Sequence, residues 1–206
     1  MVVECPVRPS RSTLASFPGR ARTIGWLALA LWTAPAAAFE IEHSEARYAD
    51  KQYRYELNVV LDAPVERVEA VLRDYEHYPD LDKRILQARV LERPGANVVM
   101  LETMLRACFG PFCRDVKRIE RVEESSHALA AITDPSRSDV KFGETHTLLS
   151  AAEHGRTRVS YRTSIVPGFW IPSIVGRRWM LRTLENATSD LFMNVERHAR
   201  PEESEE

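Results

Sequence analysis

The chain has 206 residues, with 28 lysines and arginines against 30 aspartates and glutamates, so its formal net charge is −2. Because there is no basic excess to neutralise phosphates, a nucleic-acid partner is not expected. The length suits one domain with one hydrophobic core.

Residues 1–38 have the layout of a secretory signal peptide. Two arginines precede an apolar run, residues 24–32, which is too short to span a bilayer. Ala36-Ala37-Ala38 fits a small-residue cleavage site, so we expect a mature protein that begins at Phe39 and is periplasmic or secreted. Loss of this leader removes four arginines and one glutamate, which changes the net charge from −2 to −5.

The mature chain is expected to begin with an N-terminal lead-in, residues 39–52, followed by a strand and a helix. Residues 53–62 alternate between apolar and polar side chains, which indicates a strand. Over residues 64–74, apolar side chains recur at helical spacing after a proline that can open a helix. Pro79 ends this helical stretch because it disfavours helical backbone at the residue before it.

Six further strands are expected before the C-terminal helix. Short turn signals separate them, and connections this short favour antiparallel neighbours. The expected strands are Ile85–Arg93, Val98–Cys108, Cys113–Glu123, His127–Thr133, Phe142–Ala152 and Arg156–Ile165.

A long helix is expected from Pro172 to about Ala199, and the acidic residues 200–206 are expected to form a disordered tail. The order of elements predicts an α+β domain in which a sheet of about seven antiparallel strands is covered by this helix. One apolar stripe of the helix should face the sheet, and it comprises Leu181, Leu184, Thr188, Leu191, Phe192 and Val195.

Cys108 and Cys113 flank the tip of an expected hairpin. The six histidines form no cluster with them that would hold a metal, and the spacing differs from a C-x-x-C redox motif. In an oxidising compartment the pair is predicted to form a disulfide, with two buried free thiols as the alternative. No metal site and no cofactor are expected.

Two segments carry a family resemblance. They are D-A-P-V-E-R-V-E-A-V-L-R-D-Y-E-H-Y-P-D-L, residues 62–81, and V-S-Y-R-T-S-I-V-P-G-F-W-I-P, residues 159–172. Both resemble the START-like superfamily, also called SRPBCC or helix-grip, and within it the coenzyme Q-binding and polyketide cyclase/dehydrase branch, with its lipid-transport members. The likeness covers about residues 53–199. It implies a curved sheet wrapped around the C-terminal helix, with an apolar cavity between them.

The candidate ligand-binding residues are those that would line this cavity, although a filled core is the alternative. The hydroxyls of Tyr161 and Thr163 would bond a ligand head group, or they would satisfy each other or the backbone. An inward Arg118 would bind an anionic head group, whereas solvated cross-strand pairing would leave it at the surface. The candidates are Leu86, Ala88, Val90, Arg118, Val159, Tyr161, Thr163, Ile165, Leu184, Thr188 and Leu191.

Tyr78, Phe169 and Trp170 are candidates for the cavity entrance or for a lip that contacts a membrane. Large apolar residues in a loop are either packed beneath it or used in binding. Three arginines follow in the first turns of the expected C-terminal helix, where they would meet anionic lipid.

The sequence therefore predicts an exported START-like domain that binds a hydrophobic small molecule or lipid, with a quinone-like ligand included, as a carrier or binding protein. It contains no nucleophile elbow and no phosphate-binding loop, and His146 is expected at the surface, so no catalytic residue is assigned. Two alternatives remain, a polyketide cyclase/aromatase-like enzyme and an adaptor that binds another envelope protein. The protein is expected to be a monomer that contacts membranes transiently.

Overall fold

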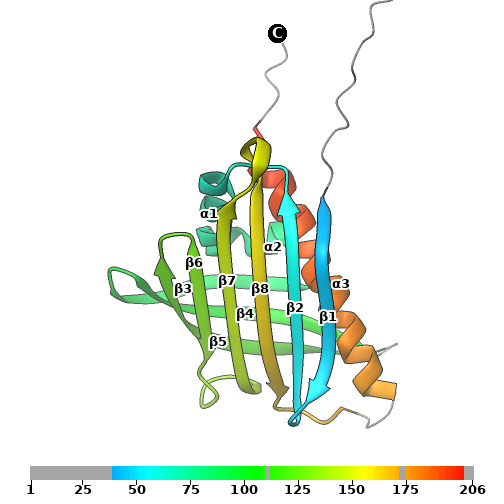
Figure 1. The fold of residues 1–206 in the computed structure, drawn as a ribbon. Helices are drawn as coiled ribbons and strands as arrows, with labels where there is room; N and C mark the ends of the chain where they lie inside the picture. Colours follow the sequence, from blue (N-terminus) through cyan, green and yellow to red (C-terminus); the bar gives the residue numbers. More distant parts are fainter. Residues whose placement is uncertain (1–38, 110–111, 172–174, 202–206) are drawn as a thin grey trace, which may run out of the picture. The chain divides into compact units, whose positions relative to one another are not determined.

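An open, curved antiparallel sheet of eight strands packs against one long helix in the computed structural model of this chain (Figure 1). The structure describes residues 39–109, 112–171 and 175–201, which all belong to the unit Ala36–Glu206. The predictions for residues 1–38 and for most of the acidic tail lie outside the described residues. The strand order is β1-β2-β8-β7-β6-β5-β4-β3, so β1 and β3 form the two edges.

The observed elements follow the predicted ones closely from residue 52 onward. The strands are β1 (Glu40–Ala49), β2 (Gln52–Leu61), β3 (Ile85–Gly95), β4 (Val98–Phe109), β5 (Phe112–Ser125), β6 (Ala128–Thr133), β7 (Val140–Ala151) and β8 (Thr157–Pro167). The helices are α1 (Val65–Arg73), the 3-10 turn η1 (Tyr75–His77), α2 (Tyr78–Leu81), the 3-10 turn η2 (Glu153–Gly155) and α3 (Val175–Ala199).

Strand β1 is the element that the sequence pattern missed. The expected lead-in, residues 39–52, instead contains a full strand that pairs antiparallel with β2 from Glu40 to Ala49. Most side chains of β1 are exposed, so the strand lacks the alternation of apolar and polar residues on which the prediction depends. The sheet therefore has eight strands rather than about seven, while the predicted α+β helix-grip class is confirmed.

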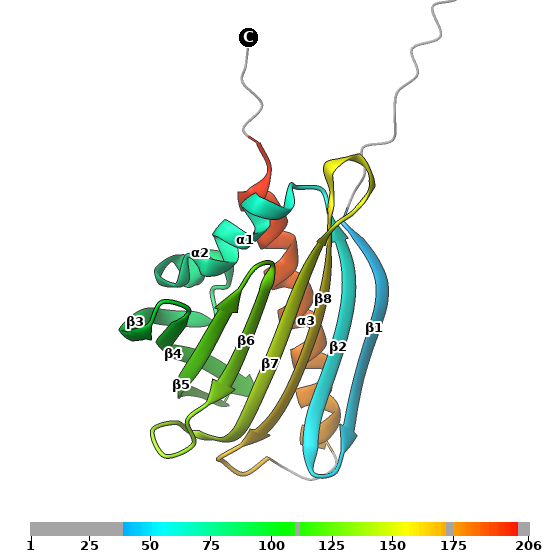
Figure 2. The same cartoon turned by 60° about the vertical axis from the view of Figure 1, so that its left-hand side comes forward.

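The inner face of the sheet packs on α3 through the residues that alternation selected on β8. Val159 and Thr163 are buried, whereas Arg158 and Arg162 point to the opposite, exposed face. Figure 2 shows α3 behind β8, β2 and β1, where these strands cover it. The core that joins the two layers includes Tyr55, Leu57, Val59, Leu61, Val68, Val159, Phe192 and Val195.

The predicted disulfide between Cys108 and Cys113 is confirmed. The two residues are directly opposed in the β4–β5 ladder, and their Cα atoms lie 3.9 Å apart. The bond therefore closes the end of this hairpin, as the spacing of the two cysteines indicated.

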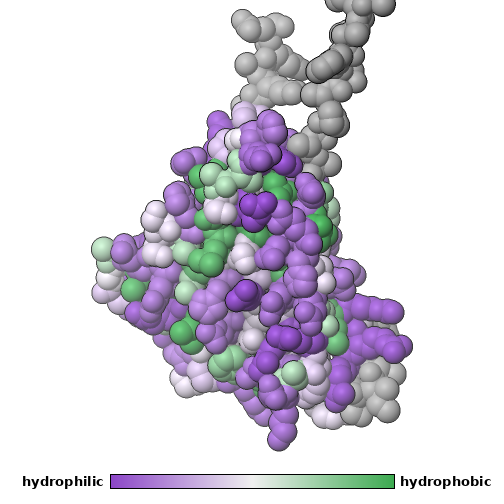
Figure 3. Space-filling view, viewed as in Figure 1, coloured by the Kyte–Doolittle hydropathy of each residue, from purple (hydrophilic) through white to green (hydrophobic). Residues whose placement is uncertain are grey.

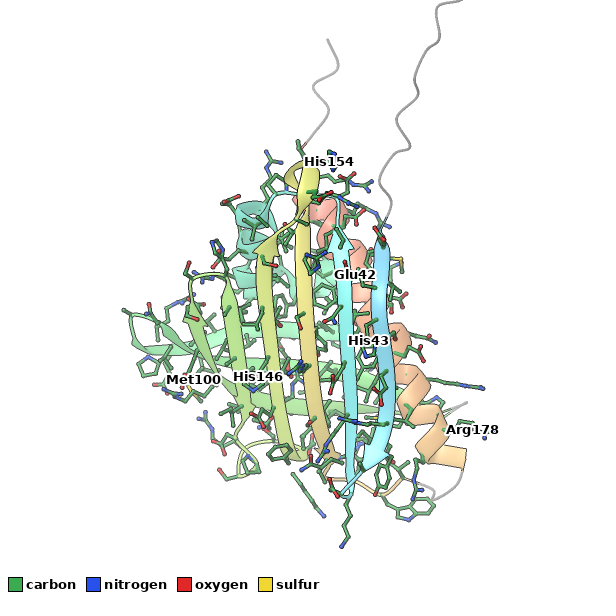
Figure 4. All side chains as sticks on the ribbon, viewed as in Figure 1. Glu42, His43, Met100, His146, His154 and Arg178 are labelled. Atoms are coloured by element: carbon green, nitrogen blue, oxygen red, sulfur yellow. A yellow bond between two sulfur atoms is a disulfide. The ribbon has the colours of Figure 1, made fainter. Side chains whose placement is uncertain are left out.

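The outer face of the sheet is mostly hydrophilic, with small apolar patches between charged side chains (Figure 3). Arg158 on β8 pairs with Glu42 on β1 at 2.8 Å, and His146 Nε2 lies 2.8 Å from Glu144 Oε1 on β7 (Figure 4). His146 is exposed, as expected from the sequence. Exposed pairs of this kind contribute little to stability, so this face owes its order to the strand ladders.

Candidate functional site

A cavity of about 110 Å³ lies between the inner face of the sheet, the segment from α1 to α2, and α3. Its volume is below the roughly 300–1,000 Å³ of typical ligand pockets, so only a short length of an apolar molecule fits without rearrangement. The cavity is lined by Leu72, Tyr75, Tyr78, Leu81, Leu101, Arg118, Glu120, Val122, Leu129, Ala131, Thr145, Thr147, Tyr161, Leu191 and Phe192.

The segment from α1 to α2, residues 65–81, forms the lid of the cavity. In α1 the buried residues Val65, Val68 and Leu72 share one face because they recur at helical spacing. The two tyrosines that follow, Tyr75 and Tyr78, place their rings 5.6 Å apart in an edge arrangement over the cavity. The lid therefore supplies one apolar wall with two phenol groups.

Side-chain hydrogen bonds attach this lid to the end of β5 and to the turn between β5 and β6. The Tyr75 hydroxyl donates to Glu124 Oε1 at 2.7 Å, and Arg73 Nη2 donates to the Ser125 carbonyl at 2.7 Å. Glu69 accepts the backbone N–H of His127 at 3.1 Å and lies 2.8 Å from the His127 ring. No strand ladder joins the lid to β5 or β6, so these hydrogen bonds and the apolar packing of Leu72 and Tyr75 in the core hold it in place.

An ion pair forms the polar wall of the cavity. Arg118 and Glu120 lie two residues apart on β5, so both side chains point inward, and Arg118 Nε is 2.9 Å from Glu120 Oε2. Glu120 is 3% exposed, and Thr133 donates a weak hydrogen bond of 3.5 Å to its other oxygen. A buried carboxylate at this position requires its cationic partner, because an unpaired charge in an apolar surrounding is costly.

Two buried donors have unused hydrogen-bonding capacity, one on this wall and one beside it. Arg118 Nε touches Glu120, but no acceptor among the described residues lies in line with its N–H group. The hydroxyl of Thr103, the residue directly opposite Arg118 in the β4–β5 ladder, also lacks a partner among the described residues. Buried polar groups are normally satisfied, so Arg118 Nε is the unsatisfied donor on the cavity wall that a ligand oxygen or water would meet, while Thr103 lies outside the lining.

The phenol groups in the cavity are held in their protonated form. Burial raises the pKa of Tyr161 above its usual value, although the nearby charge of Arg118 opposes this effect. Burial also raises the pKa of Tyr78 strongly, with a further contribution from the charge of Glu120. Both hydroxyls therefore act as hydrogen-bond donors at neutral pH and are poor candidates for a general base.

Four of the residues proposed from the sequence line this cavity, namely Arg118, Tyr161, Leu191 and Tyr78. The alternative of a satisfied hydroxyl holds for Thr163, which lies 2.9 Å from the Thr145 hydroxyl and donates to the Glu144 carbonyl. The other candidates do not line the cavity. Ala88, Val159 and Thr188 are buried, and Val90, Ile165 and Leu184 are partly buried.

The prediction that Leu86 contributes to a cavity wall is wrong. Leu86 is 41% exposed, whereas its neighbour Ile85 is buried. The register of β3 against β4 shifts between Ile85 and Gln87, which places Leu86 outside the regular alternation. A single-sequence pattern carries no signal for such a bulge.

The three candidates for the entrance or the lip lie in two separate places in the structure. Tyr78 lines the cavity, and its hydroxyl donates to the Leu72 carbonyl at 2.7 Å. Phe169 and Trp170 instead line a separate hollow, and none of its residues belongs to the cavity. Tyr78 belongs to α2, whereas Phe169 and Trp170 follow the end of β8, and sequence spacing alone does not reveal that these places are separate.

Several lining residues were missed at the sequence level, and Glu120 is the most informative of them. Its position two residues after Arg118 placed both on one face, but the charged run of β5 resembled a solvated strand. Leu101, Val122, Leu129 and Ala131 follow the alternation of β4, β5 and β6, so their inward direction was readable once those strands were paired.

Within the described residues, no group of three His, Cys, Asp or Glu side chains is arranged to hold a metal ion. The helices in this part of the chain are each too short or too polar to cross a membrane.

Comparisons with known proteins identify the fold. No family model and no curated protein sequence matches the chain. Solved structures do match over most of its length. The Zhui aromatase/cyclase from Streptomyces has a TM-score of 0.59 and 16% identity, over 71% of this chain and 93% of that one.

Two further structures show the same likeness. A START superfamily protein from Mycobacterium smegmatis has a TM-score of 0.57 and 16% identity, over 70% of this chain and 97% of that one. A STAR-related lipid transfer protein from Xanthomonas axonopodis has a TM-score of 0.56 and 14% identity, over 77% and 99%. The chain therefore has the START-like, helix-grip fold that its sequence resembled.

Proposed function

We propose that this chain is an exported START-like domain that binds a hydrophobic small molecule or lipid as a monomeric carrier or binding protein. The observation that carries the proposal is the cavity beneath the lid. Most of its walls are apolar, and one polar wall carries Arg118, Glu120 and Tyr161. The matched protein from Xanthomonas axonopodis is described as a lipid transfer protein, which agrees with this role.

The polar wall defines the chemistry of the ligand. Arg118 and Tyr161 are donors that line the cavity, and they would bind a carbonyl, hydroxyl or carboxylate oxygen of the ligand. The remaining walls require an apolar body, so fatty acids, isoprenoid quinones and related amphiphiles fit this description. Because the volume of about 110 Å³ accommodates only part of such a molecule, binding has to displace the lid.

Export is supported by the position of the first strand. Cleavage after Ala38 would leave Phe39 as the first residue and all of β1 (Glu40–Ala49) intact. The bond between Cys108 and Cys113 is also of a kind that persists outside the cytoplasm. N-terminal sequencing of the protein from its native host should give Phe39. An intact segment 20–38 in soluble cytoplasmic protein would contradict the proposal.

Purification from the native envelope, followed by mass spectrometry of co-extracted lipids, tests the binding role directly. We expect one amphiphile at up to one molecule per chain. Its amount should fall in a variant in which Ala131, on the cavity wall, becomes Leu, and not in the matched variant Ala130→Leu on the opposite face of β6. A protein that carries no amphiphile and binds no cis-parinaric acid, an amphiphilic fluorescent probe, would contradict the proposal.

A cyclase/aromatase-like enzyme is the second candidate, and the observation in its favour is the carboxylate of Glu120 within the cavity. The pairing of Glu120 with Arg118 and the raised pKa of Tyr161 leave no free base on this wall, which favours the carrier. If the protein converted an aromatic polyketide precursor and Glu120→Gln abolished the conversion while ligand binding persisted, the enzyme would be the correct function.

A further inference from the structure

A second hollow, of about 500 Å³, lies at the end of the sheet where β8 leads into α3. It is formed by the first residues of β5 and β7, the loop before β7, and the loop after β8. Its lining includes two cationic side chains, Arg114 and Lys141, and two aromatic ones, Phe169 and Trp170. Its volume falls within the range of natural ligand sites, and it shares no residue with the cavity beneath the lid.

The hollow is held in shape by backbone contacts. The N–H of Gly168 donates to the Asp139 carbonyl at 2.8 Å, and a Cβ at residue 168 would come within 2.4 Å of that oxygen. A glycine is therefore required for this close approach. The Asp139 carboxylate in turn accepts the backbone N–H of Lys117 at 2.9 Å, which fixes the loop to β5.

The exposed side chains of the hollow combine an aromatic surface with positive charge. Trp170 is 82% exposed, more than any other large apolar side chain of the described residues. The guanidinium of Arg114 lies 4.6 Å above the ring of Phe169, a cation–π contact. Neither Arg114 nor Lys141 forms an ion pair with a carboxylate of the described residues. Tryptophan beside unpaired cations is typical of surfaces that contact the interfacial region of a membrane.

The first turns of α3 extend this positive charge. Arg177, Arg178 and Arg182 are exposed and precede the first carboxylate of the helix, and Figure 4 shows Arg178 directed away from the sheet. Cations near the N-terminus of a helix are unfavourable, because they meet the positive end of the helix dipole, and the first turn holds no acid. The three arginines therefore lie where the helix dipole disfavours positive charge.

The whole chain is acidic, with a net charge of −2, or −5 after loss of the leader, whereas the hollow carries Arg114 and Lys141 against one carboxylate, Asp139, which accepts the N–H of Lys117. A negatively charged surface would thus attract this end and repel the rest of the molecule, which orients the domain. A free small anion would use the cations but would gain nothing from the exposed indole of Trp170.

We propose that the hollow formed by Arg114, Lys141, Phe169 and Trp170 docks the protein on an anionic phospholipid membrane, with a lipid phosphate between the two cations and Trp170 in the headgroup layer. This inference rests on the proposed carrier function, since a carrier has to meet the membrane that supplies or receives its ligand. The docking surface is separate from the ligand cavity, so variants at one should spare the other.

The test is vesicle flotation with the protein recovered from its native host. Vesicles of phosphatidylcholine alone are compared with equal parts of phosphatidylglycerol and phosphatidylcholine. We expect binding about tenfold stronger on the anionic vesicles, and weaker at high salt. Trp170→Ser and Lys141→Glu should each weaken it by about tenfold. The matched controls are Met193→Ser, which removes another exposed apolar side chain, and Lys83→Glu, which reverses another exposed lysine.

Binding of cis-parinaric acid in the same variants separates this inference from the proposed function. Trp170→Ser and Lys141→Glu should bind the probe as the unaltered protein does. The inference would be overturned if the unaltered protein ignored anionic vesicles, or if both variants bound them normally. It would also be overturned if soluble glycerol phosphate bound in a Lys141-dependent way while vesicles did not. Loss of probe binding in every form would instead contradict the carrier function alone.

Discussion

The ring of Tyr161 on β8 packs edge-on against the ring of Phe192 on α3, with the ring centres 5.5 Å apart. This contact joins the sheet to the long helix at the wall of the cavity, which both residues line. The cavity is therefore limited by the same aromatic packing that holds the two layers together. Substitutions at other residues can still affect the cavity alone or the core alone, because Ala131 lines the cavity and Val159 lies in the core away from it.

Ala131→Leu should reduce binding of cis-parinaric acid by about tenfold or more with little loss of stability. The added atoms enter the empty space of about 110 Å³ instead of displacing packed neighbours. Ala130→Leu, whose side chain points to the outer face of β6, is the matched control and should bind normally. Fluorescence titration and urea unfolding of both variants provide the measurement. Equal affinity in the two would show that the probe binds elsewhere.

Val159→Trp should unfold the domain or destabilise it by about 3 kcal/mol or more. Val159 is fully buried among core residues and does not line the cavity, so the larger ring has no space to occupy. Circular dichroism during thermal unfolding measures the effect. A stable, folded variant with weakened probe binding would mean that the cavity extends along β8 to Val159.

Arg118→Met should destabilise the protein by about 2–3 kcal/mol, because it leaves the carboxylate of Glu120 buried without its partner. This magnitude allows for the partial exposure of the Arg118 side chain. The double variant Arg118→Met/Glu120→Met should recover most of the loss. Arg158→Met, which breaks an exposed pair with Glu42, should cost less than about 1 kcal/mol. Urea unfolding of the unaltered protein, the two single variants Arg118→Met and Glu120→Met, and the double variant gives the coupling free energy between Arg118 and Glu120. If the losses of the two single variants simply added in the double variant, a buried ion pair would be contradicted.

Stability should fall as the pH rises above about 10. Tyr75 and Tyr78 have pKa values raised above the ordinary 10.0, first by burial and then by neighbouring carboxylates. The unfolded chain releases these protons near pH 10 while the folded protein retains them, so the stabilisation is complete below that pH and is lost above it. Each tyrosine contributes a slope of about 1.4 kcal/mol per pH unit.

Urea unfolding at a series of alkaline pH values measures this slope. Tyr75→Phe should lower the slope by the contribution of one tyrosine, about 1.4 kcal/mol per pH unit. An absorbance titration of the folded protein provides the second readout. If all its tyrosines ionised together near pH 10, the raised pKa values would be wrong.

The double variant Cys108→Ser/Cys113→Ser should fold and bind the same probe, but melt about 5 °C lower. The bond closes a short loop, and the chain-entropy relation gives about 2 kcal/mol for a loop of this size. Thiol titration of the unreduced, denatured protein should detect no thiol from this pair. Two reactive thiols, or an unchanged melting temperature, would contradict a structural disulfide.

The sequence by itself determined the elements from residue 53 onward and the inward faces of β8 and α3. Strand alternation on β8 and the helical stripe of α3 depend on local spacing, because side chains alternate across a strand and recur every turn of a helix. The Ala-Pro helix start and the cysteine spacing also act over short distances. For that reason the α+β class and the Cys108–Cys113 pair could be predicted from the sequence, with Tyr161 and Leu191 among the inward residues, whereas the sequence left the direction of Arg118 open.

Only the tertiary structure decided the features that depend on which strands become neighbours. Strand β1 exists because it pairs with β2, although its exposed side chains carry no periodic signal. The bulge that exposes Leu86, the burial of Glu120, and the separation of Phe169 and Trp170 from the cavity all arise from register and from the path of the sheet. These are contacts between residues far apart in sequence, and their energies do not appear in any local pattern.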